Sequence, residues 1–320
     1  MCQVSIQSLH PLPPDEKKVG YLVLDLAVPD HQHPPTREHV VEANRAARTL
    51  GIKIRTLTLD QDHASINRYV FHFPRYRRND AQASRIGESL AYAVDLTCGP
   101  FRDPRHSATV FPIPSVLLSS NTVLTKRRLI ELEESREPRF RTLDFPALAL
   151  SATVGFVAQH VAAAWRATPP IYSNDRLHNA ARFYRDSQEH FFVYPGQYEE
   201  VVYGDAQEPQ SGWEKSTLEA ALLAAFKTVE VLLGALPSGD ARLRRKLQSL
   251  GFDPYEPFGF PEQMPLFRFL RVMEDSRDKR SAHGSTPFGP VTVKEMFLFQ
   301  NCTRWLLVRS IEAAIGRSLE

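Results

Sequence analysis

The first part of the chain combines short apolar runs with stretches of helical periodicity. Residues 19–28 (VGYLVLDLAV) form one apolar run, which is typical of a buried strand. Residues 52–59 (IKIRTLTL) alternate apolar and polar positions, which predicts a half-buried strand, and residues 68–73 (RYVFHF) predict another. Helices are expected at about 36–50 and 81–96. This order of strand, helix, strand, strand, helix predicts a small α/β layer domain.

Helical patterns continue near residues 146–166 and 174–190. The stretch 146–165 (PALALSATVGFVAQHVAAAW) has about the length that a membrane span requires. It is rich in alanine rather than leucine, and Gln159 and His160 lie within it. A buried helix of the N-terminal domain is therefore expected, and no membrane partner.

A change of character follows residues 203–213 (YGDAQEPQSGW), whose Gly, Pro and polar content is typical of a linker. The predicted domains are therefore 1–205, an α/β layer domain, and 213–320, a helical bundle. Together they give an α+β fold class. No internal repeat or low-complexity tract is visible.

The second domain predicts four helices, at about 216–234, 240–251 and 265–284, and from Thr292 toward the C-terminus. Capping boxes, S-T-L-E and T-V-K-E, open the first and the last, and a glycine can end each of the first three. Short connections between such helices predict a compact four-helix bundle. Its apolar face is read from spacings of three and four: Leu218, Leu222, Phe226, Val229, Leu233, Leu243, Leu247, Leu250, Leu266, Phe269, Leu270, Met273, Met296, Phe299, Thr303, Leu306 and Ile311.

The end of the third predicted helix, residues 277–284 (RDKRSAHG), carries the sharpest candidate chemistry. An arginine followed by a histidine five to seven positions later also occurs at Arg185 and His190, so the bare spacing has no specificity. Context separates the two pairs. The Arg185 pair precedes the linker and is expected on the surface of a helix.

In its setting, the 277–284 segment resembles the motif of HEPN domains, four-helix modules found in many RNases and toxins. That motif begins with an arginine followed by a polar residue. Four to six positions in all then separate the arginine from a histidine. Here Asp278 follows Arg277, five residues separate Arg277 from His283, and Gly284 comes next. The segments AALLAAFKTVEVLLG and FLFQNCTRWLLVRSIEAA are similar to the apolar pattern of the family's first and last helices. The resemblance covers only the second predicted domain.

RNA can be cut without a metal if its 2′-hydroxyl attacks the adjacent phosphate. A histidine can move the protons, because its pKa lies near neutrality, and a guanidinium can neutralise two phosphate oxygens. His283 is assigned the general acid/base role, Arg277 the phosphate-stabilising role and Asp278 the orientation of either. Lys279 and Arg280 would hold the RNA backbone. The alternative is a solvated basic helix end with a polar C-cap.

One arginine and one histidine are half a site, and positions six apart on a regular helix point about 120° apart. The resemblance implies a homodimer whose two copies build one composite site. It also implies a defence or toxin setting, with a regulatory protein or antitoxin as a possible partner. Two alternatives stay open: a non-catalytic HEPN module that binds RNA, nucleotide or protein, and a function in residues 1–205 with the bundle as a dimeriser.

The composition of the chain bears on its partners, metal sites, location and cofactors. The net charge is +2, and 30 of the 39 basic residues are arginine, which permits an RNA-facing surface but also follows from a GC-rich genome. Cys2, Cys98 and Cys302 are widely spaced, so neither a disulfide framework nor a structural zinc site is expected. With no apolar leader at the N-terminus, a cytoplasmic location is predicted. Glycine-rich phosphate loops and G-x-S-x-G are lacking, so no cofactor is expected.

Three further groups of residues suggest functional hypotheses with less support. The histidines of residues 31–39 (HQHPPTREH) could chelate a metal, but a loop is expected there, without further ligands. Residues 73–80 (FPRYRRND) have the composition of a nucleic-acid surface, although a solvated strand end is favoured. Lys227 and Glu230 share a helix face and are expected to form a solvent-exposed ion pair. The alternative turns them toward the 277–284 helix.

Overall fold

The computed structural model describes residues 20–29, 37–51, 53–61, 64–73, 80–97, 154–190, 212–259, 262–281 and 291–319. These residues are mostly helical, with two small sheets, in an α+β arrangement. The contacts divide the chain into two compact units. The first holds the elements from β1 to α5 and the second those from α6 to α11.

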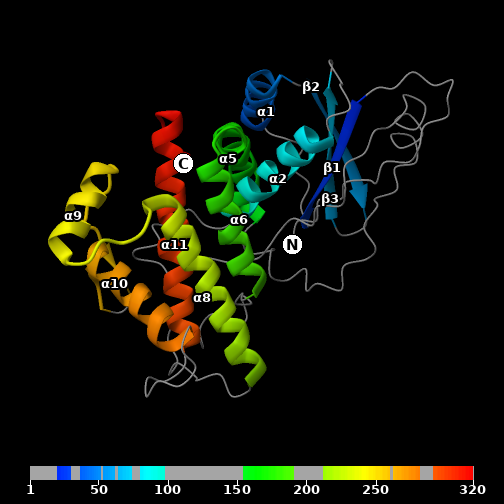
Figure 1. Ribbon diagram of the computed structural model, residues 1–320. Helices are drawn as coiled ribbons and strands as arrows, with labels where there is room; N and C mark the ends of the chain where they lie inside the picture. The colour runs from blue at the N-terminus through cyan, green and yellow to red at the C-terminus, as the bar shows by residue number, and fades with distance from the viewer. Residues whose placement is uncertain are drawn as a thin grey trace. The chain divides into compact units, whose positions relative to one another are not determined.

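The first unit contains a three-stranded antiparallel sheet (Figure 1). Its strands are β1 (Gly20–Pro29), β2 (Lys53–Gln61) and β3 (Ala64–Phe73), in the order β1-β3-β2. Val70 of β3 lies opposite Val23 on one side and Arg55 on the other. The central strand therefore separates β1 from β2, which run parallel to each other, and helix α1 (Arg37–Leu50) connects them. The predicted order of strands and helices is confirmed.

Three helices of the first unit pack together on one side of the sheet (Figure 1). Helix α5 (Val154–Ser173) packs against both α1 and α2 (Asp80–Thr97). Small side chains allow this close approach, and the buried alanines are Ala43, Ala46 and Ala47 on α1 and Ala162, Ala163, Ala164 and Ala167 on α5. The predicted buried helix is thus present from Val154, and residues 146–153 lie outside the described part.

Within the described residues, none of the helices combines the length and the apolar character that crossing a membrane would demand.

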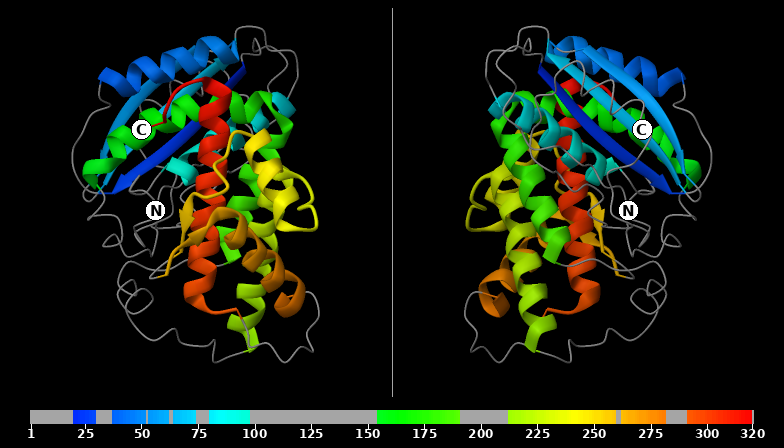
Figure 2. Two further views of the ribbon diagram at one scale, coloured as in Figure 1. Left: turned by 90° about the vertical axis from the view of Figure 1, so that its left-hand side faces the viewer. Right: turned by 90° about the vertical axis from the view of Figure 1, so that its right-hand side faces the viewer.

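The second unit contains all four helices predicted after the linker. They are α8 (Gly212–Leu233), α9 (Asp240–Ser249), α10 (Leu266–Ser276) and α11 (Val293–Ile315). Helix α6 (Asp175–His190) joins them and runs alongside α8 and α11 (Figure 2). A two-stranded hairpin, β4 (Pro257–Phe258) with β5 (Met264–Pro265), connects α9 to α10.

The predicted apolar face is buried at nearly every position. Sixteen of the seventeen residues named for it are buried, and Leu250, which is 37% exposed at the end of α9, is the exception. Aromatic contacts extend this core from the hairpin to α11. Phe258 lies 5.7 Å from Phe269 and 5.1 Å from Trp305, measured between ring centroids.

Two boundaries differ from those expected from the sequence. Helix α8 begins at Gly212, so Ser216 lies one turn inside the helix rather than at its start. Glu and Lys at positions 214 and 215 have high helix propensity and allow this extension. The division of the chain also falls before α6 instead of at 205–213, because Thr228 of α8 donates to the Ala180 carbonyl (3.2 Å) and Gln300 of α11 to the Ser187 carbonyl (3.0 Å).

Helix ends follow the predicted signals more closely. Gly234 and Gly251 have φ angles of 72° and 84°, which a residue with a side chain rarely adopts, and they end α8 and α9 as expected. The second capping box is confirmed. Thr292 Oγ1 accepts from the Glu295 N–H at 3.1 Å, and Glu295 Oε2 accepts from the Thr292 N–H at 2.9 Å.

Candidate functional site

Arg277 lies where the backbone of the third helix changes its winding. Helix α10 ends at Ser276, and Arg277–Ser281 form one turn of π-helix, η2. Such turns are uncommon and occur frequently at functional sites. Arg277 follows Met273 by four positions, so the arginine continues the buried face of α10. Its side chain is consequently only 22% exposed.

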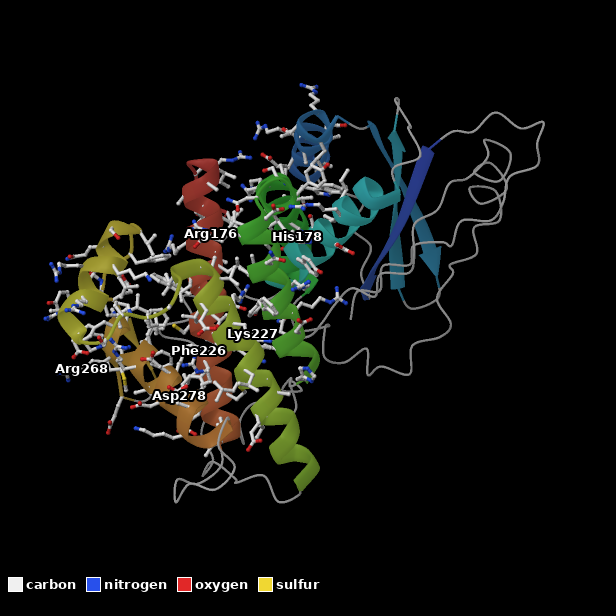
Figure 3. The ribbon with its side chains drawn as sticks, viewed as in Figure 1. Arg176, His178, Phe226, Lys227, Arg268 and Asp278 are labelled. Atoms are coloured by element: carbon white, nitrogen blue, oxygen red, sulfur yellow. The ribbon has the colours of Figure 1, made fainter. Side chains whose placement is uncertain are left out.

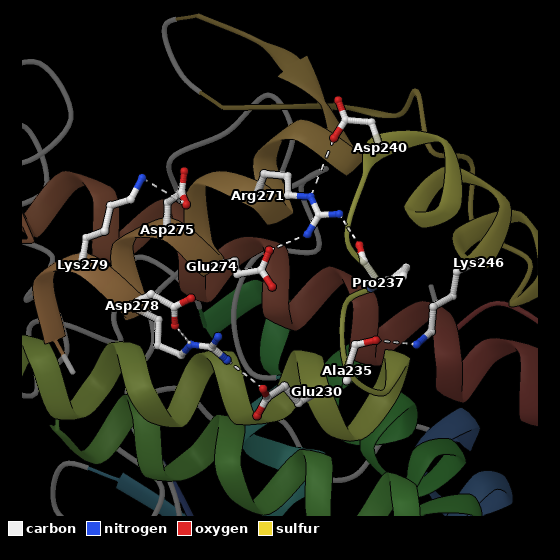
Figure 4. A network of polar contacts seen from close by, with 11 residues as sticks. Glu230, Ala235, Pro237, Asp240, Lys246, Arg271, Glu274, Asp275, Asp278 and Lys279 are labelled. Atoms are coloured by element: carbon white, nitrogen blue, oxygen red, sulfur yellow. Dashed lines mark hydrogen bonds and ion pairs between the residues drawn. The ribbon is translucent and has the colours of Figure 1, made fainter. Parts of the chain in front are cut away.

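The guanidinium of Arg277 is held from two elements (Figure 4). Its Nη1 donates to Glu230 Oε1 of α8 at 2.7 Å, and its Nε donates to Asp278 Oδ1 at 2.7 Å. Its central carbon lies 4.0 Å from the centroid of the Phe226 ring. Phe226 and Glu230 are one turn apart on α8, so one helix face provides both the ring and the carboxylate. These contacts fix the side chain in one orientation.

Two of the five N–H groups of Arg277 are used in this arrangement. Nε and one hydrogen of Nη1 donate to the carboxylates, while Nη2 has no partner in the described part of the chain. Neither the Nη2 hydrogens nor the second Nη1 hydrogen has an acceptor among the described residues. The Nη1–Nη2 edge of a guanidinium can donate to two oxygens of a phosphate or carboxylate.

Burial alone would lower the pKa of Arg277, but its hydrogen bonds and charge interactions with Asp278 and Glu230 outweigh that effect and raise the pKa. The guanidinium therefore stays charged at every physiological pH. One cation between two carboxylates gives this cluster a net charge of −1. An anionic ligand would need further positive charge nearby.

The remaining residues of the 277–284 motif are only partly described. Lys279 Nζ lies 3.2 Å from Asp275 Oδ1, and the two side chains are 46% and 63% exposed, so this pair is solvated and contributes little stability. The side chain of Arg280 and all of His283 lie outside the described residues. Asp278 makes one of the two contacts predicted for it, the bond to Arg277.

Lys227 and Glu230 do not form the expected ion pair. Glu230 binds Arg277, whereas Lys227 Nζ lies 5.3 Å from the centroid of the Phe183 ring on α6. For Glu230, the alternative that turns it toward the motif helix is the one observed. Phe226 was predicted as a core residue, and Glu230 follows it by four positions. That spacing puts Glu230 beside the buried face of α8 and is the signal from which its position could be predicted.

The second arginine–histidine pair is not a surface pair. Arg185 is 8% exposed because α6 packs against α8 and α11, whereas His190 is exposed. The histidines of 31–39 and the arginines of 73–80 lie outside the residues whose side chains are described. Among the described residues, no group of His, Cys, Asp and Glu side chains could hold a metal ion.

Comparison of the chain with protein-family models, curated proteins and solved structures finds no match.

Proposed function

We propose that this chain is a metal-independent endoribonuclease of the HEPN type, with its site at the η2 turn of a HEPN-like helical bundle. The observation that carries the proposal is the state of Arg277. Its guanidinium is charged, is held by two carboxylates and an aromatic ring, and has N–H hydrogens with no acceptor among the described residues. A preorganised cation of this kind stabilises the charge that develops on a phosphate during strand cleavage.

The proposed reaction needs no metal ion. The 2′-hydroxyl oxygen of one nucleotide attacks the adjacent phosphorus while the bond from phosphorus to the 5′-oxygen of the next nucleotide breaks. His283 takes the hydroxyl proton or gives a proton to the leaving oxygen, and Arg277 donates to the non-bridging oxygens. The products are a 2′,3′-cyclic phosphate and a 5′-hydroxyl. Asp278 and Glu230 act as positioning residues, because they hold Arg277 rather than the RNA.

The charge of the cluster supports a composite site. The charges of Arg277, Glu230 and Asp278 sum to −1. This net charge disfavours the binding of an RNA phosphate unless other cations lie nearby. Arg280 and His283 of the same chain would contribute positive charge, and a second copy across a two-fold axis would double it. We therefore propose a homodimer acting on RNA in the cytoplasm. A defence or toxin setting with a regulatory protein or antitoxin belongs to the same proposal.

A non-catalytic module is the second candidate, and the same cluster favours it. Two carboxylates around one guanidinium also make a structural ion-pair network that joins α8 to η2. In that case the bundle would bind RNA, a nucleotide or a protein without cutting. A function in residues 1–205, with the bundle as a dimeriser, predicts instead that a fragment ending at Tyr203 keeps the activity.

RNA cleavage in excess EDTA tests the proposal, with the ends of the products mapped. Wild type is compared with His283→Ala and with Arg277→Lys, which keeps the charge but loses the planar fork. Cleavage by wild type alone, with 2′,3′-cyclic phosphate ends, would support the nuclease. RNA binding without cleavage by any of the three proteins would support the binding module.

A further inference from the structure

A second basic surface lies on α9, apart from the Arg277 site. Helix α9 carries Arg242, Arg244, Arg245 and Lys246 but only one acidic residue, Asp240. Leu243 and Leu247 are fully buried and define its inner face. At 100° per residue, Arg245 points directly away from that face, with Arg242 beside it. In Figure 3, side chains on the outward side of α9 end in nitrogen atoms.

The flanks of α9 are fixed by its other two cations. On one flank, Lys246 Nζ donates to the carbonyl of Ala235, just after the end of α8, at 2.7 Å (Figure 4). On the other flank, Arg244 Nη1 donates to the Tyr255 hydroxyl at 3.0 Å. These two bonds hold the flanks of the helix. Arg242 and Arg245 are exposed and form no hydrogen bond or ion pair within the described part of the chain.

Aromatic rings lie beside two other arginines of this surface, Arg244 and Arg268. The Arg244 guanidinium lies 5.2 Å from the centroid of Phe267, and that of Arg268, on α10, lies 5.9 Å from the same ring. Tyr255 packs edge-on against Phe267, with 5.9 Å between centroids, and is 56% exposed. A large ring this exposed beside the Arg244 guanidinium offers a stacking surface rather than a buried contact.

The described carboxylates of Asp240 and Asp253 make their contacts away from the outward arginines. Asp240 Oδ1 lies 3.7 Å from Arg271 Nε, on the side of α10. Asp253 Oδ1 accepts from the backbone N–H of Tyr255 at 2.9 Å. Both acids therefore serve the local fold.

We propose that Arg242, Arg244, Arg245, Arg268 and Tyr255, the α9 basic surface, bind a single strand of RNA. The cations contact its phosphates, and the exposed ring of Tyr255 stacks on a base. Cations with accessible aromatic rings are the usual platform for single strands. A purely electrostatic partner, such as an anionic membrane, would explain the arginines but would leave the exposed ring without a role.

The α9 basic surface is separate from the catalytic site. Arg268 and Arg277 are nine positions apart, which is about 13 Å along α10 and about half a turn around it. The surface therefore supplies affinity rather than chemistry. The choice of RNA as its ligand rests on the proposed function.

Binding is measured with a fluorescent single-stranded 2′-O-methyl oligonucleotide, which lacks the attacking hydroxyl, by anisotropy in EDTA at several salt concentrations. Arg242→Glu/Arg245→Glu should raise Kd on the order of tenfold, and the salt slope should become shallower by about 1.4, or 0.7 per lost phosphate contact. Tyr255→Ala should raise Kd about fivefold, and Tyr255→Phe should not. Arg48→Glu/Arg176→Glu changes the net charge equally at exposed arginines elsewhere and should bind as wild type.

Equal binding by the α9 double variant and its control would overturn the inference. So would a wild type that binds no single strand, or one that prefers phosphatidylcholine–phosphatidylserine vesicles to RNA. Cleavage of unmodified RNA separates this inference from the nuclease. The α9 double variant should raise KM and leave kcat unchanged. A wild type that binds RNA through α9 but does not cut it would support the α9 basic surface and refute the proposed nuclease activity. Cleavage that the α9 double variant leaves unchanged would support the nuclease activity and refute RNA binding at α9.

Discussion

Glu230 and Arg277 are 47 positions apart in the chain, yet Oε1 of the first lies 2.7 Å from Nη1 of the second. This contact joins the first predicted helix of the bundle to the motif at the end of the third. It fixes the arginine and places a negative charge next to the position proposed for the RNA phosphate. Opposite effects on binding and on turnover follow from those two roles.

Glu230→Gln keeps a hydrogen-bond acceptor but removes the charge. We expect KM for RNA to fall, because a carboxylate that repels phosphate is lost. We expect kcat to fall about tenfold or more, because the guanidinium is less firmly oriented. Steady-state cleavage of a short RNA in EDTA measures both. Glu219→Gln, on the same helix and with no arginine contact in the described residues, is the control, and an unchanged kcat in Glu230→Gln would contradict a positioning role.

The ring of Phe226 under the Arg277 guanidinium should contribute a measurable coupling. Phe226 is 1% exposed, so Phe226→Leu alone should lower the free energy of unfolding by about 1–3 kcal/mol through lost packing. A double-mutant cycle with Arg277→Met isolates the cation–π part, expected at about 0.5–1 kcal/mol for a partly exposed cation. Urea denaturation of the four proteins gives the cycle. A coupling near zero would mean that the ring serves only the core.

Asn301, on α11, should be replaceable with a gain in stability. It is 2% exposed, and neither of its amide atoms has a hydrogen-bond partner in the described part of the chain. Asn301→Leu should raise the free energy of unfolding by about 1–2 kcal/mol, because the unfolded chain no longer loses the hydration of a buried amide on folding.

Its neighbour Gln300 provides the matched comparison. Gln300 is 1% exposed, but its Nε2 donates to the Ser187 carbonyl and hydroxyl at 3.0 and 3.1 Å. Gln300→Leu should therefore lower the free energy of unfolding by about 1–3 kcal/mol. Both variants are measured by urea denaturation with a constant m-value. The same sign for the two variants would refute this distinction.

Cys302 should make the folded protein less stable at alkaline pH. Burial raises the pKa of its thiol well above the ordinary value, so the folded chain keeps the proton while the unfolded chain releases it above about pH 8.5. The unfolded state then binds fewer protons, and the free energy of unfolding falls by up to about 1.4 kcal/mol per pH unit. Cys302→Ala should lack this component. Parallel stability curves of the two proteins from pH 8 to about pH 10 would disprove it.

Local signals determined most of the helical part. Apolar residues three and four apart defined the inner faces of the bundle helices, and sixteen of those seventeen positions are buried. The capping box at Thr292 formed because both of its partners lie within one turn. The box at Ser216 failed although its letters are equally good. A capping signal competes with the helix propensity of the residues before it, and here the helix continued to Gly212.

What the sequence determined by itself was therefore which helices of the bundle form, which faces they bury and that Arg277 lies toward the end of the third of them. Only the tertiary structure decided that α6 belongs with α8 and α11, that Arg185 is buried, and that Glu230 binds Arg277 instead of Lys227. The physical reason is the range of the interactions. Helix periodicity and caps act within one or two turns, whereas an ion pair between residues 47 positions apart exists only after two helices have packed.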